Sequence, residues 1–128
     1  MKLLLDTHAF IWWDSEPTKL SPQVLTFCQD PQNLWILSVA SVWEMQVKLQ
    51  LGKLKLSVPL ESLIEGQHRT NNLEILPVML AHVLALQNLL AHHKDPFDRM
   101  LICQAIAHGM IILTPDPLIT QYPVRTVW

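Results

Sequence analysis

The chain has 128 residues, half of them hydrophobic, with 9 lysines and arginines against 11 aspartates and glutamates. This size and composition predict a single domain over residues 1–128 and exclude a disordered chain. The apolar runs are far shorter than the roughly 20 residues of a membrane-spanning helix, and no signal peptide is expected. The net charge of −2 argues at first sight against a nucleic-acid partner, whose binding surface is normally basic.

The two cysteines, Cys28 and Cys103, are too few and too far apart for a disulfide framework or a metal knuckle. We interpret them as ordinary reduced residues, which is the state expected inside the cell. A cytoplasmic location is therefore predicted.

Apolar runs and helical patterns alternate along the chain. Residues 2–5 hold three leucines with no polar residue between them, which is typical of a strand buried on both faces of a parallel sheet. By the same signals we expect strands at 2–5, 34–38, 73–78, 110–114 and 124–128, and helices near 10–13, from Ser21, at 41–52, from about Leu60, at 80–90 and at 95–109. This alternation predicts a parallel α/β sheet covered by helices on both faces.

Two acids each follow the carboxyl end of a predicted strand. Asp6 comes directly after the first strand, and Asp116 lies in the TPDP turn after residues 110–114. In open parallel sheets ligands bind outside the carboxyl ends of the strands, and a buried carboxylate is unfavourable unless it is paired. The competing interpretation makes Asp6 a helix cap and Asp116 an ordinary turn residue.

Glu44 lies in the helical pattern that follows the second strand. Ser41 and Glu44 match the S-x-x-E capping box, in which Glu44 would only tie down a helix start. If Ser38 is the cap instead, the helix starts earlier and Glu44 points from its second turn toward the strand ends. The apolar neighbours of Glu44 favour the functional interpretation.

Asp95 and Asp98 open the clearest helix of the chain. Asp95 before Pro96 is a good N-cap, which accounts for it fully. Asp98, at the third or fourth helical position and followed by a long apolar stretch, is less well explained by capping. Arg99 beside it is interpreted either as part of a surface ion pair or as a contact for a ligand phosphate.

Taken together, Asp6, Glu44, Asp98 and Asp116 all fall at one predicted edge of the sheet. Several carboxylates close together repel unless a cation lies between them, and oxygen ligands without cysteine suit Mg²⁺ or Mn²⁺. Such sites serve phosphate chemistry by activating water and offsetting phosphoryl charge. Setting these four acids aside leaves 9 basic and 7 acidic residues, so the net charge no longer argues against RNA or DNA, although it does not favour them either.

Four stretches, LLDTHAFIWW, LSVASVWEMQVKLQLGKL, HHKDPFDRMLICQAIAHGMIILTPD and YPVRTVW, resemble the PIN-domain family over nearly the whole chain. The likeness is greatest to the VapC-type toxins of type II toxin–antitoxin pairs. The resemblance implies a three-layer α/β/α sandwich with a central, mainly parallel sheet of Rossmann-like topology. It also implies a Mg²⁺- or Mn²⁺-dependent endoribonuclease, a cognate antitoxin protein and a homodimer.

Carried over by motif, the four acids of the family correspond to Asp6, Glu44, Asp98 and Asp116, the last being the more variable. We therefore expect these four to be both metal ligands and catalytic residues. Asp95 is expected to be a cap or an assisting acid. Thr7 is either an ordinary helix start or a hydrogen-bond partner of a metal-bound water.

Other features are given weaker functional interpretations. His92, His93 and Lys94 are expected in a solvated loop rather than at a zinc site, because no cysteine joins them. The tryptophans are expected in the core or an interface rather than stacked on bases. A dinucleotide cofactor is not expected, because no G-x-G-x-x-G follows the first strand. The competing class of function is a non-catalytic binding module in which the acids act as caps.

Overall fold

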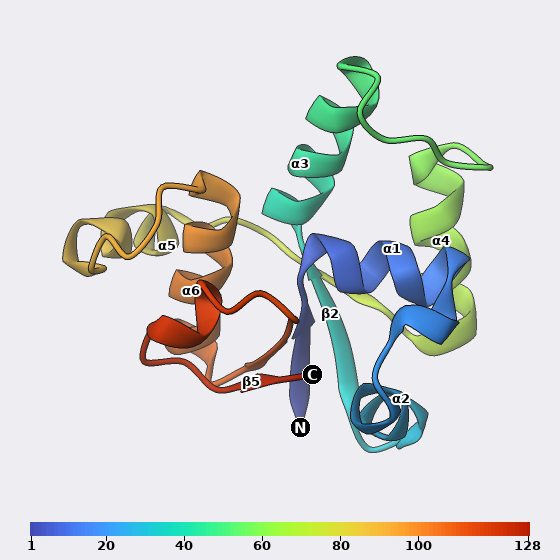
Figure 1. Cartoon of the computed structure of the whole chain (residues 1–128), viewed down its shortest axis with the longest axis horizontal. Coiled ribbons are helices and arrows are strands. Elements are labelled where there is room, and N and C mark those ends of the chain that lie inside the picture. The colour runs from blue at the N-terminus through green and yellow to red at the C-terminus, as the bar shows by residue number, and fades with distance from the viewer.

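Five short strands, all paired in parallel, form the centre of the molecule in the computed structural model, which describes all 128 residues (Figure 1). Their order across the sheet is β3-β2-β1-β4-β5. The strands are β1 (Lys2–Leu5), β2 (Leu34–Ser38), β3 (Glu74–Leu76), β4 (Ile111–Leu113) and β5 (Thr126–Val127). Because every pairing is parallel, the carboxyl ends of all five strands lie at one edge of the sheet.

Helices cover both faces of this sheet, as Figure 1 shows for α1, α2 and α4 on one side and α5 and α6 on the other. The helices are α1 (Thr7–Ser15), α2 (Pro22–Gln29), α3 (Val39–Gln50), α4 (Leu60–Asn71), α5 (Leu80–Ala85) and α6 (Pro96–His108), with 3₁₀ turns η1 (Pro17–Lys19), η2 (Leu86–Asn88) and η3 (Ile119–Gln121). The predicted three-layer α/β/α sandwich is therefore confirmed. None of the helices is long and apolar enough to cross a membrane.

The leucines of β1 divide the hydrophobic core into two parts. Leu3 and Leu5 pack in a cluster that includes residues of α1, α2 and α4, whereas Leu4 packs in a second cluster with residues of α6. Successive side chains of a strand point to opposite faces, so an uninterrupted leucine run fits a strand with a core on each side. The two cysteines are buried and unpaired, as the sequence predicts.

Local capping signals fix several helix ends where the sequence places them. The Ser21 hydroxyl accepts a hydrogen bond from the Val24 N–H at 3.1 Å and so caps α2. α6 starts after Asp95 and ends at Gly109, whose φ of +63° lies in the left-handed region that favours glycine. These ends need no tertiary information, because the capping group lies within one turn of the helix.

Other boundaries differ from the sequence predictions. α3 begins at Val39 rather than at 41, because Ser38 is its N-cap and accepts a hydrogen bond from the Ala40 N–H. The predicted helix at 80–90 is α helical only to Ala85 and continues as the 3₁₀ turn η2. β3 ends at Leu76, before Pro77, which has no N–H to donate to a neighbouring strand.

Candidate functional site

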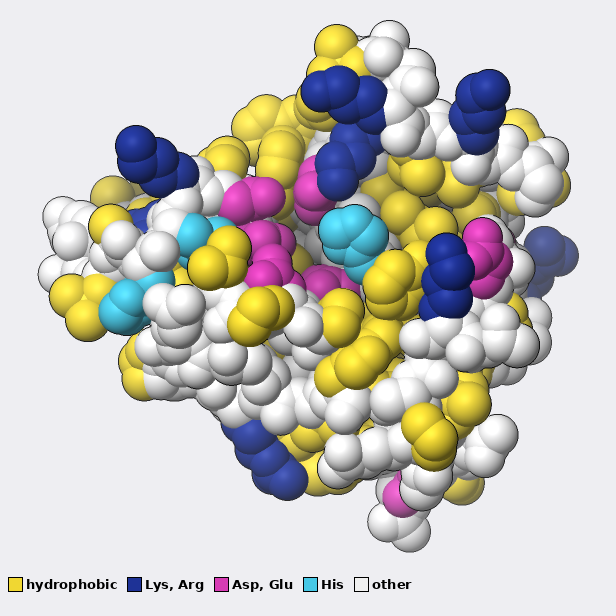
Figure 2. All heavy atoms as spheres, in the orientation of Figure 1, with side chains coloured by type: hydrophobic (Ala, Val, Ile, Leu, Met, Phe, Trp, Pro, Cys, Tyr) yellow, Lys and Arg dark blue, Asp and Glu magenta, His cyan; other side chains and the backbone are white.

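Four acidic side chains from four separate parts of the chain lie at the carboxyl-end edge of the sheet. Asp6 follows β1, Glu44 lies in the second turn of α3, Asp98 is the third residue of α6, and Asp116 lies in the turn after β4. Figure 2 shows acidic side chains gathered in the middle of this face, with histidine and basic side chains beside them. The parallel sheet thus brings the predicted acids to one region.

Asp6 is the N-cap of α1, as the capping interpretation predicts, and it is also a buried acid. Its Oδ1 accepts a hydrogen bond of 2.7 Å from the Ala9 N–H, and its side chain caps α1. Only 4% of the residue is exposed. Burial raises the pKa of the Asp6 carboxyl and Glu44 adds to the rise, while the Thr114 hydroxyl, the Ala9 N–H and His8 oppose it.

Glu44 is held by two partners that the structure brings to it. Its Oε1 accepts a hydrogen bond of 2.6 Å from the Thr7 hydroxyl, and its Oε2 pairs with the Lys48 ammonium at 2.9 Å. Since Ser38 caps α3, the alternative capping box between Ser41 and Glu44 is wrong. Glu44 therefore connects α3 to the start of α1, beside Asp6. Lys48, four residues after Glu44, could have been found from the helical i,i+4 spacing of opposite charges.

Asp98 has the most strongly perturbed ionisation of the four acids. Burial is the largest cause, and the charges of Asp95, Glu44, Asp6 and Asp116 add to it, raising the Asp98 pKa to about 7. A carboxyl group whose pKa is raised by four other carboxylates lies where negative charge is concentrated. A cation at this position would restore the ionised form.

Asp95 and Asp116 are held by local backbone hydrogen bonds. Asp95 Oδ1 accepts from the Phe97 and Asp98 N–H groups at 2.9 and 3.1 Å, so Asp95 is the N-cap of α6 as predicted. Asp116 Oδ1 accepts from the Leu118 N–H at 2.9 Å, which is the Asx turn expected for TPDP. The negative charges of both acids nevertheless help to raise the pKa of Asp98.

His93 is a site residue that the sequence analysis placed wrongly. His92 and Lys94 are exposed, as expected for a solvated loop, but the His93 side chain is only 8% exposed. Its Nε2 lies 3.3 Å from Asp98 Oδ2, and its Nδ1 lies 2.9 Å from the Tyr122 hydroxyl. No local pattern indicates this contact, because Tyr122 comes 29 residues later in the chain.

Arg99 also differs from one of its two sequence interpretations. Its guanidinium donates hydrogen bonds to the carbonyls of Leu89 and Leu90 and to the Tyr122 hydroxyl, at 3.2, 2.9 and 3.1 Å. It forms no ion pair with an acid, so the interpretation as part of a surface ion pair is wrong. Arg99 instead fixes the segment before α6 and orients Tyr122.

The donor set of the site fits a hard divalent cation by its chemistry. All four acids offer oxygen, which Mg²⁺ and Mn²⁺ prefer. The buried Ser41 hydroxyl, one turn before Glu44 on α3, has no hydrogen-bond partner. As placed, no three histidine, cysteine, aspartate or glutamate side chains converge closely enough to hold an ion. The carboxylates would therefore have to draw together, or share water molecules, to ligate one.

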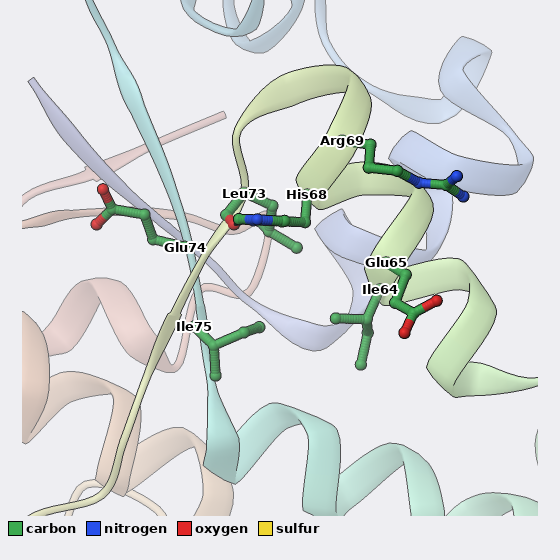
Figure 3. A pocket seen from close by; sticks show the side chains of 7 residues that line it. All are labelled: Ile64, Glu65, His68, Arg69, Leu73, Glu74 and Ile75. Atoms are coloured by element: carbon green, nitrogen blue, oxygen red, sulfur yellow. The ribbon is translucent and has the colours of Figure 1, made fainter.

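The largest hollow of the molecule lies elsewhere. It measures about 760 Å³ and is lined by Ile64, Glu65, His68, Arg69, Leu73, Glu74 and Ile75. Figure 3 shows these side chains on α4 and on the strand beside it, with acidic and basic groups mixed. None of the four acids lines this hollow, so its size does not mark it as the centre of the chemistry.

The fold and the site together define the class of the protein: an α/β protein with a cluster of acidic residues at the carboxyl ends of its parallel strands. Residues 3–124 match the family model of the PIN domain. The chain therefore belongs to the PIN domain family, as its sequence resemblance indicated.

The chain is also similar to individual proteins. Ribonuclease VapC22 of Mycobacterium tuberculosis is 28% identical over 132 aligned residues, which cover 98% of each chain. VapBC2 from Rickettsia felis, solved bound to a DNA fragment from their promoter, has a TM-score of 0.75 at 16% identity, covering 99% of this chain and 98% of that one. DNA-bound VapBC from Salmonella typhimurium has a TM-score of 0.71 at 17% identity, covering 99% and 97%.

Proposed function

We propose that this chain is a Mg²⁺- or Mn²⁺-dependent endoribonuclease that acts in the cytoplasm as the toxin of a type II toxin–antitoxin pair. The observation that carries the proposal is the gathering of Asp6, Glu44 and Asp116, from three separate parts of the chain, around Asp98 at the carboxyl ends of the strands. The name of the relative from M. tuberculosis, a ribonuclease, supports RNA as the substrate. VapBC assemblies among the structural neighbours support a protein partner.

In this proposal, Asp6, Glu44, Asp98 and Asp116 hold the ion. A bound divalent ion supplies positive charge that offsets the charge of the phosphodiester and lowers the pKa of the attacking water. Asp6 is oriented by the Ala9 N–H, and Glu44 is oriented by Thr7. Asp98 contacts His93 through Oδ2, and no hydrogen bond from the protein to Oδ1 is present.

Lys48 is suited to contact the substrate. Its ammonium pairs with Glu44 Oε2 at 2.9 Å, and its side chain is 34% exposed at the rim of the acidic region. An ion bound by Glu44 would replace part of this pairing. The ammonium would then be available to a phosphate of the RNA backbone, whose charge it complements.

Cleavage of an end-labelled single-stranded RNA pool tests the proposal, with Mn²⁺, with Mg²⁺ and with a chelator. We expect cleavage with either ion, and its loss with the chelator or in Asp6→Asn. Asparagine caps a helix as well as aspartate, so this variant keeps the Ala9 hydrogen bond and removes only the charge. Asp30→Asn is the matched control, because Asp30 lies before β2 at the opposite end of the strands. Cleavage retained by purified Asp6→Asn would refute the role of Asp6.

The alternative is a PIN-fold module that binds partners without catalysis. The capping bonds of Asp6 and Asp95 are the observation that favours it, since they explain those two acids without a metal. They leave unexplained why Asp98, which caps nothing, shares its surroundings with four other acids. Absence of metal-dependent cleavage in a protein that binds its partner would select this alternative.

We assign the homodimer implied by the family resemblance to an apolar groove between α3, α5 and α6. The groove measures about 400 Å³, and its lining includes Val39, Trp43, Val83 and Phe97. Trp43 is 64% exposed and packs edge-on against Phe97. An exposed apolar patch of this kind is typical of a protein interface.

Light scattering after size-exclusion chromatography tests this assignment. Trp43→Lys is expected to convert the dimer to a monomer, because a lysine ammonium would be buried without a partner. Leu51→Lys is the control, since Leu51 is 63% exposed outside the groove. A Trp43→Lys protein that remains dimeric would place the interface elsewhere.

A further inference from the structure

His93 is joined on both sides of its ring to groups of the site. Nε2 lies 3.3 Å from Asp98 Oδ2, and Nδ1 lies 2.9 Å from the Tyr122 hydroxyl oxygen. The side chain is 8% exposed, so water does not compete freely for these nitrogens. A neutral imidazole has one N–H donor and one acceptor nitrogen, and the question is which nitrogen carries the proton.

The hydrogen bonds of Tyr122 answer that question. Its hydroxyl oxygen accepts from the His93 backbone N–H at 3.2 Å and from Arg99 Nη1 at 3.1 Å. A hydroxyl has two acceptor positions and one proton, so both acceptor positions are used. The hydroxyl proton must therefore be donated to the third neighbour, His93 Nδ1. His93 then carries its own proton on Nε2, where it can be donated only toward Asp98.

Arg99 keeps Tyr122 in this role. Its guanidinium is fixed by the carbonyls of Leu89 and Leu90 in addition to Tyr122, and it always carries its protons. Tyr122 itself is buried in the core cluster of α6, with 3% exposure. The direction of the hydrogen bonds from Arg99 through Tyr122 and His93 to Asp98 is thus determined at every step.

We propose that His93 is a positioning residue that donates a hydrogen bond from its Nε2–H to Asp98 Oδ2 and thereby directs Oδ1 toward the bound cation. Tyr122 and Arg99 hold His93 in the required tautomer. The inference rests on the proposed function, because it concerns the ion that Asp98 would bind. Hydrogen-bond partners of metal-binding carboxylates orient those ligands, and their loss reduces metal affinity or activity by about 10- to 100-fold. His93 acts through Asp98 and does not itself contact the reacting atoms.

Titration of metal-free protein with Mn²⁺, followed by calorimetry, measures this effect without relying on activity. We expect His93→Ala to weaken Mn²⁺ binding by about 10- to 100-fold and His93→Gln to restore most of it, because the glutamine amide can donate to Asp98. His92→Ala is the matched control. His92 is exposed, and its ring packs at 85° to the Tyr122 ring, but it takes no part in the hydrogen bonds that lead to Asp98, so its removal should leave Mn²⁺ affinity unchanged.

A second measurement examines the tautomer directly in metal-free protein. Nitrogen chemical shifts of the His93 ring, recorded at alkaline pH, should show the proton on Nε2. Tyr122→Phe removes the only donor to Nδ1, so the His93 ring should populate both tautomers and Mn²⁺ affinity should fall. This variant also serves if His93→Ala does not fold, since phenylalanine keeps the packing of the ring.

The outcomes separate this inference from the proposed function. A parent protein that binds no Mn²⁺ contradicts the metal site and the inference together. A parent that binds Mn²⁺, with His93→Ala and Tyr122→Phe binding it as tightly as the parent, contradicts only the role of His93. Equal losses in His92→Ala and His93→Ala would assign the effect to the loop as a whole and also overturn the inference.

Discussion

The hydroxyl of Thr7 donates a hydrogen bond of 2.6 Å to Oε1 of Glu44, a residue 37 positions later in the chain. Both side chains are buried, and the bond joins the first residue of α1 to the second turn of α3. Asp6, the N-cap of α1, precedes Thr7 directly. The first helix turn thus supplies both an acid of the site and the group that orients a second acid.

Thr7→Val should destabilise the protein, because valine keeps the shape of threonine but cannot donate to Glu44. A hydrogen bond to a charged group contributes about 1.5–3 kcal/mol, and Lys48 still pairs with Glu44, so we expect the lower part of that range. Urea unfolding of metal-free protein measures the difference in free energy of unfolding. Thr26→Val is the control, since the exposed Thr26 hydroxyl bonds only the Pro22 carbonyl. Equal stability losses in both variants would contradict a special role for the Thr7 bond.

The pKa of Asp98 makes the stability of the metal-free protein depend on pH. The folded-state pKa is raised from 3.8 to about 7, so the folded state holds a proton that the unfolded chain releases. The stabilising contribution is complete below the unfolded pKa and is lost as pH rises through the folded value. Asp98→Asn removes this titration and should be more stable than the parent above pH 7 by on the order of 2 kcal/mol. Parallel stability–pH curves for the two proteins would contradict the raised pKa.

Mn²⁺ should raise the melting temperature of the parent protein, because an ion that binds only the folded state stabilises it. At 100 times the dissociation constant this stabilisation is about 2.7 kcal/mol. Asp116→Asn is expected to reduce the Mn²⁺-dependent shift in melting temperature while keeping its turn. Asp30→Asn is matched to it, because Asp30 Oδ1 likewise accepts a hydrogen bond from the backbone N–H two residues later. If the acids are only caps and turn formers, Mn²⁺ should leave all three melting temperatures unchanged.

The buried His82 should make the attachment of α5 sensitive to acid. Its Nδ1 accepts the Met79 N–H at 3.0 Å, and its Nε2 lies 2.8 Å from His108 Nε2 on α6. Burial and the nearby His108 lower the pKa of His82, so its contribution to stability is present above the unfolded pKa of 6.5 and is lost as pH falls. The loss can reach about 1.4 kcal/mol per pH unit.

Hydrogen exchange of the α5 amides, compared between neutral and acidic pH, tests this expectation. His82→Gln, which has no titrating group, should remove most of the acid-induced exchange in α5. Gln87→Ala, a change at an exposed position in η2, is the control and should behave as the parent does. Acid-induced exchange that persists in His82→Gln would assign the pH dependence to another group.

The sequence by itself determined the parts of this protein that depend on neighbouring residues. The leucine run of β1, the caps Ser21 and Asp95, and Gly109 at the end of α6 are local signals, and each lies where it was predicted. Parallel strands necessarily share one carboxyl edge, so the common location of Asp6, Glu44, Asp98 and Asp116 also followed from their order in the chain.

Only the tertiary structure decided how those acids are held. Thr7 meets Glu44, and His93 meets Tyr122, because segments distant in sequence pack together; the same arrangement brings His93 to Asp98. The same packing directs Arg99 to the carbonyls of Leu89 and Leu90 rather than to an acid. Local sequence patterns indicate which side chains are buried. The hydrogen-bond partner of each buried side chain depends on the folded arrangement of the whole chain.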